Sequence, residues 1–419
     1  MTERPPQHSA AKHKSRLSMV RRAVKRAIKH AINDAASSLV QFLPPPATHN
    51  VGVLRLPSPL LFAVVGGMGD ALMVGSLARH LLKRNPGLVI DALVTPQACE
   101  IIERSVNGKV YNLRRFGVVR RDFQKYFLPL RSKHYPLGFD FSHISFSAAV
   151  FLYAIGIPIR VGFWPISNST KAHLMTHAVK LDESKSAWEL YVELVRLADP
   201  NLPETVHILP VAYTEEESNH VHRWRMSVAG RDGMPLIAFH MGCGPARTYR
   251  QSPTERYLAL AHGLQRLTGG CLIVLTGSRS ERPIIDAFKS NYVGRTVDAV
   301  DWTVGQLACL LEQCDLLVSV DTGVMHLGAA MGCPTIGLFG PSSPVQWAPS
   351  GAKATYVYKT RIPCSPCNRE FRCIQPRHCS NPDQLRCMWD IEPDDVLKAI
   401  RDVAGAPLSA KGLASTITY

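Results

Sequence analysis

Short apolar runs alternate with longer stretches of helical periodicity through most of this chain. The runs are largely apolar at successive positions, a pattern typical of strands buried on both faces of a sheet. They occupy residues 60–65, 88–94, 236–240, 271–276, 316–320 and 334–339. Helical spacing is found at residues 71–84, 255–267, 303–313 and 393–403. Strands separated by helices imply parallel sheets with right-handed crossovers, so the pattern predicts an α/β fold.

The pattern starts again near residue 236, so we expect two Rossmann-like halves facing one central cleft. A length of 419 residues also suits about two or three domains. We assign a basic tail and helix to residues 1–50, a first Rossmann-like domain to 51–212, a bridging segment to 213–234, a second Rossmann-like domain with a cysteine-rich loop (364–387) to 235–404, and a loose tail to 405–419.

Composition places the protein in the cytoplasm. Its residues are 46% hydrophobic and 19% charged, as in folded, soluble proteins. No apolar run reaches the length of a membrane-spanning helix, and the apolar residues near the start are interleaved with Arg and Lys, unlike those of a signal peptide. Eleven cysteines without an export signal favour a reducing compartment.

The N-terminal 43 residues hold nine Lys and Arg against two acids, a net charge of +7 within the +15 of the chain. From Arg16 to Ala36 the apolar positions recur at helical spacing, which predicts a basic amphipathic helix able to lie on an anionic membrane surface. A solvated helix, or one packed on the body, fits the same pattern. A nucleic-acid arm is disfavoured because aromatic stacking residues and docking motifs are missing.

The most informative turn follows the apolar run 316–320. There Asp321, Thr322 and Gly323 lead into a short helix that carries His326. Free N–H groups at such a helix start can hold a phosphate without a metal ion. Taken singly, Asp321 is also explained as a helix cap and His326 as an ordinary helical histidine. Their joint occurrence at strand-turn-helix spacing favours the phosphate site.

A second turn, Gly66–Asp70, follows the first apolar run. Its glycines do not have the spacing of a dinucleotide-binding fingerprint. Asp70 would repel a pyrophosphate at this helix start, but its carboxylate suits acceptance of a proton from a hydroxyl. A helix cap is the alternative interpretation of Asp70.

Further candidates follow two strands of the second half. His240 ends one strand, and Arg247 and Arg250 come shortly after it. Guanidinium groups bind phosphate in bidentate fashion, which suits an anionic ligand, although surface ion pairs compete as an explanation. Glu281 follows the strand 271–276 and can accept hydrogen bonds from ribose, unless it is an exposed residue of a helix start.

These residues give the chain a resemblance to glycosyltransferase family 9, the ADP-heptose:lipopolysaccharide heptosyltransferases. The similarity runs from about residue 60 to 403 and is most specific over residues 321–327, with 338–341 and Trp347 downstream. Gly69-Asp70 and His240-Met241-Gly242 also match the family. Two places depart from it: residues 250–253 read Arg-Gln-Ser-Pro where Lys-x-Trp-Pro is common, and residues 71–76 lack the usual Thr-Pro.

The resemblance implies a GT-B fold, an inverting mechanism and no catalytic metal. Asp70 would be the general base for the acceptor hydroxyl. Thr322, Gly323 and His326 would hold the diphosphate, Asp321 would contact the donor sugar, and Glu281 would bind the ribose. His240 and Arg250 complete the expected donor site, and the first domain would bind the acceptor.

Five cysteines lie within residues 364–387, opened by a Cys-x-x-Cys pair. In a reducing compartment this spacing predicts a structural zinc or iron site. Some relatives that glycosylate autotransporter proteins hold iron with such cysteines. Free thiols or disulfides are the alternatives. The expected ligands are Cys364, Cys367, Cys373 and Cys387, with Cys379 as the substitute.

The sequence thus predicts a cytoplasmic transferase, peripheral on the inner face of the cytoplasmic membrane. It would move heptose from ADP-heptose, a nucleotide-sugar donor, to a lipopolysaccharide core or another glycan acceptor. A protein acceptor or another nucleotide sugar is the alternative within this class. A nucleotide-sugar epimerase of GT-B shape and a non-catalytic nucleotide-binding scaffold are alternatives from other classes.

Overall fold

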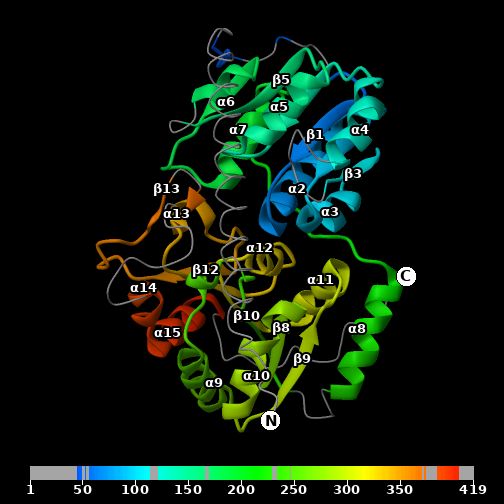
Figure 1. The fold of residues 1–419 in the computed structure, drawn as a ribbon. Helices are drawn as coiled ribbons and strands as arrows, with labels where there is room; N and C mark the ends of the chain where they lie inside the picture. The colour runs from blue at the N-terminus through cyan, green and yellow to red at the C-terminus, as the bar shows by residue number, and fades with distance from the viewer. Residues whose placement is uncertain are drawn as a thin grey trace, which may run out of the picture.

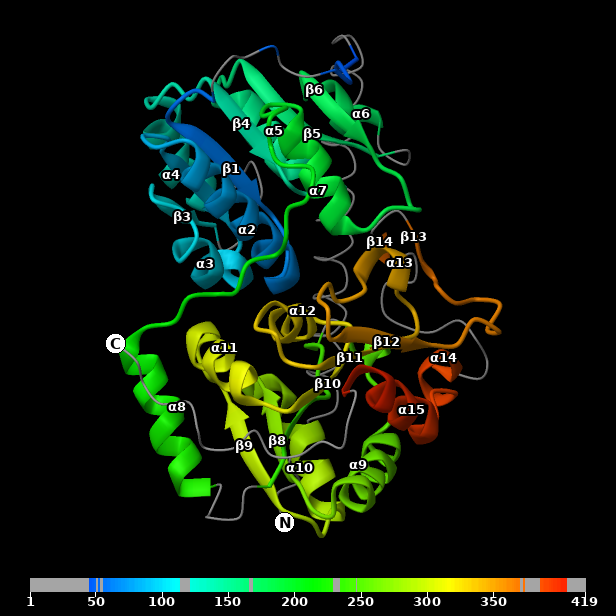
Figure 2. The same ribbon diagram turned by 180° about the vertical axis from the view of Figure 1, so that it is seen from behind.

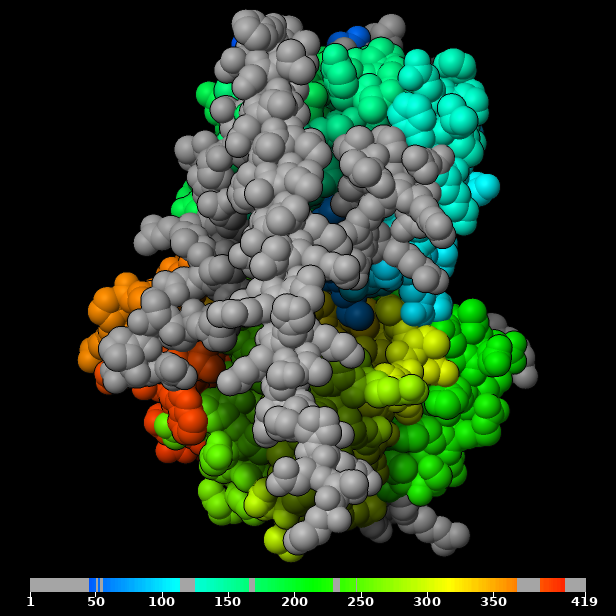
Figure 3. Space-filling model, in the orientation of Figure 1, coloured from blue at the N-terminus to red at the C-terminus, as the bar shows by residue number. Residues whose placement is uncertain are grey.

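The computed structural model describes residues 45–49, 52, 56–113, 121–165, 169–228, 234–245, 247–369, 372–373 and 385–404. These residues form two Rossmann-like domains, which appear as an upper and a lower lobe (Figures 1 and 3). The predicted α/β fold with two parallel sheets is therefore confirmed. The N-terminal helix and the loose C-terminal tail that we predicted lie outside the described residues.

The first domain is built on a parallel sheet with the strand order β3-β2-β1-β4-β5-β6. β1 lies at its centre and is buried along its whole length, and Phe62 packs edge-on against Phe139 and Phe141. The strands are β1 (Leu60–Val64), β2 (Ile90–Val94), β3 (Val110–Asn112), β4 (Leu137–Asp140), β5 (Ile159–Trp164) and β6 (His177–Lys180). The helices are α2 (Met68–Arg84), α3 (Pro96–Glu103), α4 (Arg121–Arg131), α5 (Phe146–Ala154), α6 (Ser169–His173) and α7 (Ala187–Arg196).

The second domain repeats this topology, with the strand order β12-β11-β10-β7-β8-β9. Each sheet reverses its order beside its first strand, which is where open α/β sheets bind ligands at the carboxyl ends of their strands. The strands are β7 (Leu236–His240), β8 (Leu272–Gly277), β9 (Thr296–Val300), β10 (Leu316–Val320), β11 (Thr335–Phe339) and β12 (Ala354–Tyr358). Its α-helices are α9 (Thr254–Thr268), α10 (Arg282–Asn291), α11 (Val304–Gln313), α12 (Gly323–Ala330), α13 (Pro344–Trp347), α14 (Arg386–Trp389) and α15 (Pro393–Ala404).

The remaining elements connect or decorate the two domains. Helix α8 (Glu215–Val228) lies along the outer side of the second domain (Figure 2). Two short 3-10 helices are η1 (Thr248–Arg250) and η2 (Arg279–Glu281). Strands β13 (Asn368–Arg369) and β14 (Arg372–Cys373) form an antiparallel pair. The predicted strands and helices of the second half are all present, and their ends lie within one residue of the prediction.

The two domains meet through the first turns of α2 and α12, which lie side by side in both ribbon views (Figures 1 and 2). A Cβ atom added to Gly323 would touch Met68 Cβ and would lie 2.9 Å from the Gly69 nitrogen. A Cβ on Gly69 would lie 2.9 Å from His326 Cδ2. Only glycine permits backbones to approach so closely, so these two positions bring the predicted turns 66–70 and 321–326 together.

Candidate active site

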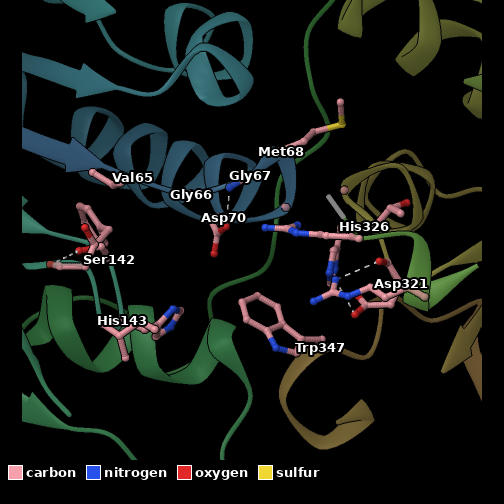
Figure 4. A pocket seen from close by; sticks show the side chains of 18 residues that line it. Val65, Gly66, Gly67, Met68, Asp70, Ser142, His143, Asp321, His326 and Trp347 are labelled. Carbon is pink, nitrogen blue, oxygen red and sulfur yellow. Dashed lines mark hydrogen bonds and ion pairs between the residues drawn. The ribbon is translucent and has the colours of Figure 1, made fainter. Parts of the chain in front are cut away.

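A cavity of about 220 Å³ opens where the two helix starts meet (Figure 4). Both domains contribute to its wall, as expected for a ligand site at the carboxyl ends of two facing sheets. It is lined by Val65, Gly66, Gly67, Met68, Gly69, Asp70, Phe141, Ser142, His143, Ile144, Ser145, Arg247, Arg250, Asp321, Thr322, Gly323, His326 and Trp347. The structure thus gathers in one place Asp70 and five of the predicted donor-site residues.

Asp70 projects into this cavity from the first turn of α2 (Figure 4). One carboxylate oxygen, Oδ2, accepts a hydrogen bond of 2.7 Å from the Gly67 N–H, and the other, Oδ1, accepts one of 2.8 Å from the Tyr191 hydroxyl. The helix begins at Met68, three residues earlier than the sequence indicated. Asp70 therefore stabilises the helix start and also presents a carboxylate to the cavity.

The opposite wall is the start of α12. Thr322 is its N-cap residue in extended conformation, and Gly323 is its first helical residue. The N–H groups of a first helical turn have no partner within the helix, and the helix dipole adds partial positive charge there. This wall can therefore hold an anionic group.

His326 lies in the next turn of α12 and is buried, with 4% of its surface exposed. Burial lowers its pKa, although the charges of Asp321 and Asp70 act in the other direction. The imidazole is therefore neutral near pH 7 and can donate one hydrogen bond. Its buried Nδ1 has no hydrogen-bond partner among the described residues, so this atom is available to a ligand.

Arg250 supplies positive charge beside this wall. Its guanidinium lies 2.9 Å from the Asp321 carboxylate and donates to the Asp321 carbonyl oxygen at 3.2 Å. Burial opposes the charge of Arg250, but Asp321 together with Tyr249 and Cys243 raises its pKa. The buried Arg250 Nε has no hydrogen-bond partner within the described part of the chain. Asp321 thus orients the Arg250 guanidinium at the cavity, and the Arg250 Nε–H remains available as a donor.

A second cavity of about 520 Å³ continues from the start of α12 into the second domain. Its size falls within the range of about 300–1,000 Å³ typical of small-ligand sites. Both His240 and Glu281 line it, together with Ser278 and Trp302 from the second domain and Gln97 from the first. The predicted donor residues are therefore divided between two adjoining cavities, with Asp321, Thr322 and Gly323 lining both.

Glu281 is buried at the floor of this second cavity. Its carboxylate accepts hydrogen bonds from the backbone N–H groups of Gly244 (2.9 Å) and Ser278 (2.7 Å) and from the Ser278 hydroxyl. Burial alone would raise the pKa of Glu281, but His240 and these hydrogen bonds lower it. Burial lowers the pKa of His240, whose Nδ1 lies 3.1 Å from Thr276 Oγ1. Glu281 is therefore a charged acceptor and not an exposed helix-start residue.

An aromatic wall of the first cavity was not predicted. The ring of His143 stacks on Phe163 at 4.9 Å, lies against Tyr191, and meets Trp347 of the second domain edge-on at 5.8 Å. Burial, with the charge of Lys171, lowers the pKa of His143 to about 3. His143 follows β4, a strand that the sequence analysis did not identify. The apolar Leu137-Gly138-Phe139 before it was the available signal.

The cysteine-rich loop gives no metal centre among the residues whose placement is described. Cys364 is exposed, Cys367 is half-buried and Cys387 is buried. The side chain of Cys373 and the whole of Cys379 lie outside the described residues. The predicted ligand set therefore stays a prediction.

Comparison with known proteins places the chain beside sugar transferases. A family model described as glycosyltransferase family 9 (heptosyltransferase) matches residues 124–377. Lipopolysaccharide heptosyltransferase 2 of Escherichia coli K12 is 28% identical over 315 residues, which cover 69% of this chain and 85% of that protein.

Two solved structures share the fold. The ADP-heptose lipopolysaccharide heptosyltransferase II of E. coli has a TM-score of 0.62 at 22% identity, covering 82% of this chain and 98% of the other. A family 9 glycosyltransferase from Veillonella parvula has a TM-score of 0.65 at 18% identity, covering 83% of this chain and 97% of the other. Among the helices described here, none is long and apolar enough to cross a membrane.

Proposed function

The chain belongs to glycosyltransferase family 9, and on that premise we propose that it transfers heptose from ADP-heptose to a lipopolysaccharide-core acceptor, with inversion and without a catalytic metal. The donor and acceptor are suggested by the two E. coli proteins named above, which are lipopolysaccharide heptosyltransferases. The observation that carries the proposal is the shared cavity, in which Asp70 of one domain faces the start of α12 in the other.

In the proposed reaction, Asp70 accepts the proton of an acceptor hydroxyl as its oxygen attacks the anomeric carbon of the donor. The bond between that carbon and the diphosphate oxygen breaks, and the electron pair leaves with the nucleoside diphosphate. Because the base and the diphosphate site are assigned to different domains that line one cavity, we propose that attack comes from the face opposite the diphosphate. Such in-line displacement inverts the configuration at the anomeric carbon.

The charge that develops on the diphosphate is matched by groups of the chain itself. The N–H groups at Thr322 and Gly323, the Arg250 guanidinium and the neutral His326 ring all lie at one wall of the cavity. Donors fixed in place before the reaction stabilise a leaving anion without reorganisation, which is the role that a divalent cation has in other transferases. The unused Arg250 Nε and His326 Nδ1 supply two such donors.

The nucleoside is proposed to occupy the second cavity, next to the diphosphate wall. Glu281 is the acceptor we assign to the ribose hydroxyls. A carboxylate has about four lone-pair sites, so the three hydrogen bonds from Gly244 and Ser278 leave about one for the ligand. His240 lies beside Glu281 and helps to keep it charged.

Replacement of Asp70 tests the proposal. Asp70→Asn removes the proton acceptor and retains the shape, so turnover should fall about 10²–10⁴-fold while ADP binding changes less than about twofold. Exposed Asp286 on α10 offers a matched control, since Asp286→Asn should leave both unchanged. Unchanged turnover in Asp70→Asn would reject the base assignment.

A screen of nucleotide sugars by melting-temperature shift tests the donor. A true donor stabilises the native state by mass action, so ADP-heptose should raise Tm more than other nucleotide sugars do. Transfer assays with core oligosaccharide and with protein acceptors then separate the two acceptor classes. Conversion of the donor with no acceptor present would instead identify an epimerase.

We also propose that residues 1–43 hold the enzyme on the cytoplasmic membrane surface, because their net charge of +7 complements anionic lipid. Deletion of residues 1–43 should abolish flotation with vesicles that contain phosphatidylglycerol. Wild-type protein should not float with pure phosphatidylcholine. Retained binding of the truncated protein would rule out this role.

The cysteine-rich loop is proposed to hold a structural metal ion, zinc or iron, through Cys364, Cys367, Cys373 and Cys387. The support is the sequence spacing. Elemental analysis should find about one metal ion per chain in wild-type protein and in Cys99→Ser, and none in Cys364→Ser. Absence of stoichiometric metal from wild-type protein would refute this part of the proposal.

A further inference from the structure

Tyr191 is a fully buried tyrosine whose hydroxyl reaches the candidate base. It lies on α7, where a capping box between Ser186 and Glu189 fixes the helix start. Its ring packs against Phe141 at 5.9 Å and Phe163 at 5.8 Å. These contacts leave the side chain in one place, so the position of its hydroxyl is set by the core of the first domain.

The Asp70 carboxylate is consequently held from both sides. The Tyr191 hydroxyl donates to Oδ1 at 2.8 Å, and the Gly67 N–H donates to Oδ2 at 2.7 Å. One donor comes from α7 and the other from the turn before α2. Because each binds a different oxygen, the two together restrict both the position and the orientation of the carboxylate. Burial, with the charge of Asp70, raises the pKa of Tyr191 well above its usual value. The hydroxyl therefore remains a donor throughout the working pH range.

The same ring also contacts the wall beside which an acceptor would lie. His143 lies 4.9 Å from the Tyr191 ring and lines the cavity. Trp347 reaches His143 from the second domain. Tyr191 thus links the base to the aromatic wall, and a fixed relation between base and acceptor is what rapid proton transfer requires.

We propose that Tyr191 is a positioning residue, which orients the Asp70 carboxylate toward the acceptor hydroxyl through its own hydrogen bond to Oδ1. The inference rests on the proposed function, in which Asp70 is the base. It adds a residue that acts through Asp70 and does not touch the substrate. A purely structural role would require only the ring, whereas the positioning role requires the hydroxyl.

Removal of this hydroxyl separates the two roles. Tyr191→Phe keeps the ring and its packing, so the fold is retained. We expect kcat to fall about tenfold, the value of a hydrogen bond to a charged group, while KM for donor and acceptor stays within about twofold.

Tyr257 provides a matched control. It is fully buried in the second domain, and its hydroxyl has no hydrogen-bond partner among the described residues. Tyr257→Phe should leave kcat and KM unchanged. Wild-type kcat in Tyr191→Phe would overturn the inference, as would an increase in KM without a fall in kcat.

A double-mutant cycle distinguishes this inference from the function on which it rests. If Tyr191 acts through Asp70, then Tyr191→Phe should reduce turnover no further in an Asp70→Asn background. Additive losses would reject the positioning role and leave the base assignment intact. Full turnover in Asp70→Asn alone would reject the base assignment itself.

Discussion

The contact between α2 and α12 at Gly323 offers a direct test of whether the approach of the two domains sets the rate of transfer. Gly323→Ala would add a single methyl group at the first residue of α12. That methyl group would meet Met68 Cβ and the Gly69 nitrogen, at 2.9 Å from the latter. Backbone atoms cannot turn aside as a flexible side chain does, so the two helix starts must move apart.

The size of the effect follows from this distance. Ordinary contact of a Cβ atom begins at 3.4 Å, which requires a separation of at least about half an ångström. Overpacking of this kind costs about 1–3 kcal/mol of stability. A misplacement of about 1 Å can reduce catalysis about 10²-fold, so half that displacement should lower kcat about tenfold.

Gly328→Ala on the same helix is the control. Its added methyl group would meet the flexible end of Leu317, a residue of the same domain, and not the opposite domain. Both variants should lower the melting temperature, but only Gly323→Ala should lower kcat. Wild-type kcat in Gly323→Ala, or equal losses of kcat in both variants, would refute the reasoning.

Three further predictions follow from other buried groups. Burial disfavours the charge of Glu217, but Arg104 and neighbouring hydrogen bonds lower its pKa from 4.5 to about 2. The charged Glu217 therefore stabilises the fold above pH 4.5. Up to about 3 kcal/mol of unfolding free energy should be lost as the pH falls toward 2, and denaturant titration of Glu217→Gln should show no such loss. Lys171 is fully buried at 3.2 Å from Asp140, so Lys171→Met should lower the free energy of unfolding by about 3–5 kcal/mol because it leaves the Asp140 charge unpaired. A double variant with Asp140→Leu removes that charge as well and should lose less stability. His326→Ala should weaken ADP binding about tenfold by calorimetry, and unchanged affinity would remove His326 from the diphosphate site.

The sequence analysis was most successful where strands are central and continuous. β1 and β10 are buried along their whole length, and their apolar runs are plain in the sequence. β5 and β6 are only partly buried and include Arg160, His177 and Lys180, so they carry no such run. β4 is buried but has only four residues, with Gly138 and Asp140 among them, so it was also missed. The first sheet was predicted with two of its six described strands.

The candidate site likewise contains residues that local sequence patterns predict and one whose role they could not predict. The turns at Asp70 and at Asp321–His326 follow apolar strands directly, and the topology of parallel sheets places both at the cleft. The role of Glu281 as a buried acceptor of backbone hydrogen bonds depends on Gly244, 37 positions earlier in the chain. No local pattern could distinguish it from an exposed residue of a helix start.

Two α/β halves, and the turns that carry an acid in one half and an anion site in the other, follow from the amino-acid sequence alone. These are local properties, because hydrophobic periodicity and turn residues act within a few positions. Which groups come into contact depends on the folded arrangement of the chain. Tyr191 reaches Asp70 across 121 positions, and Gly323 lies against Gly69 of the other domain, since side-chain packing between distant segments sets these contacts.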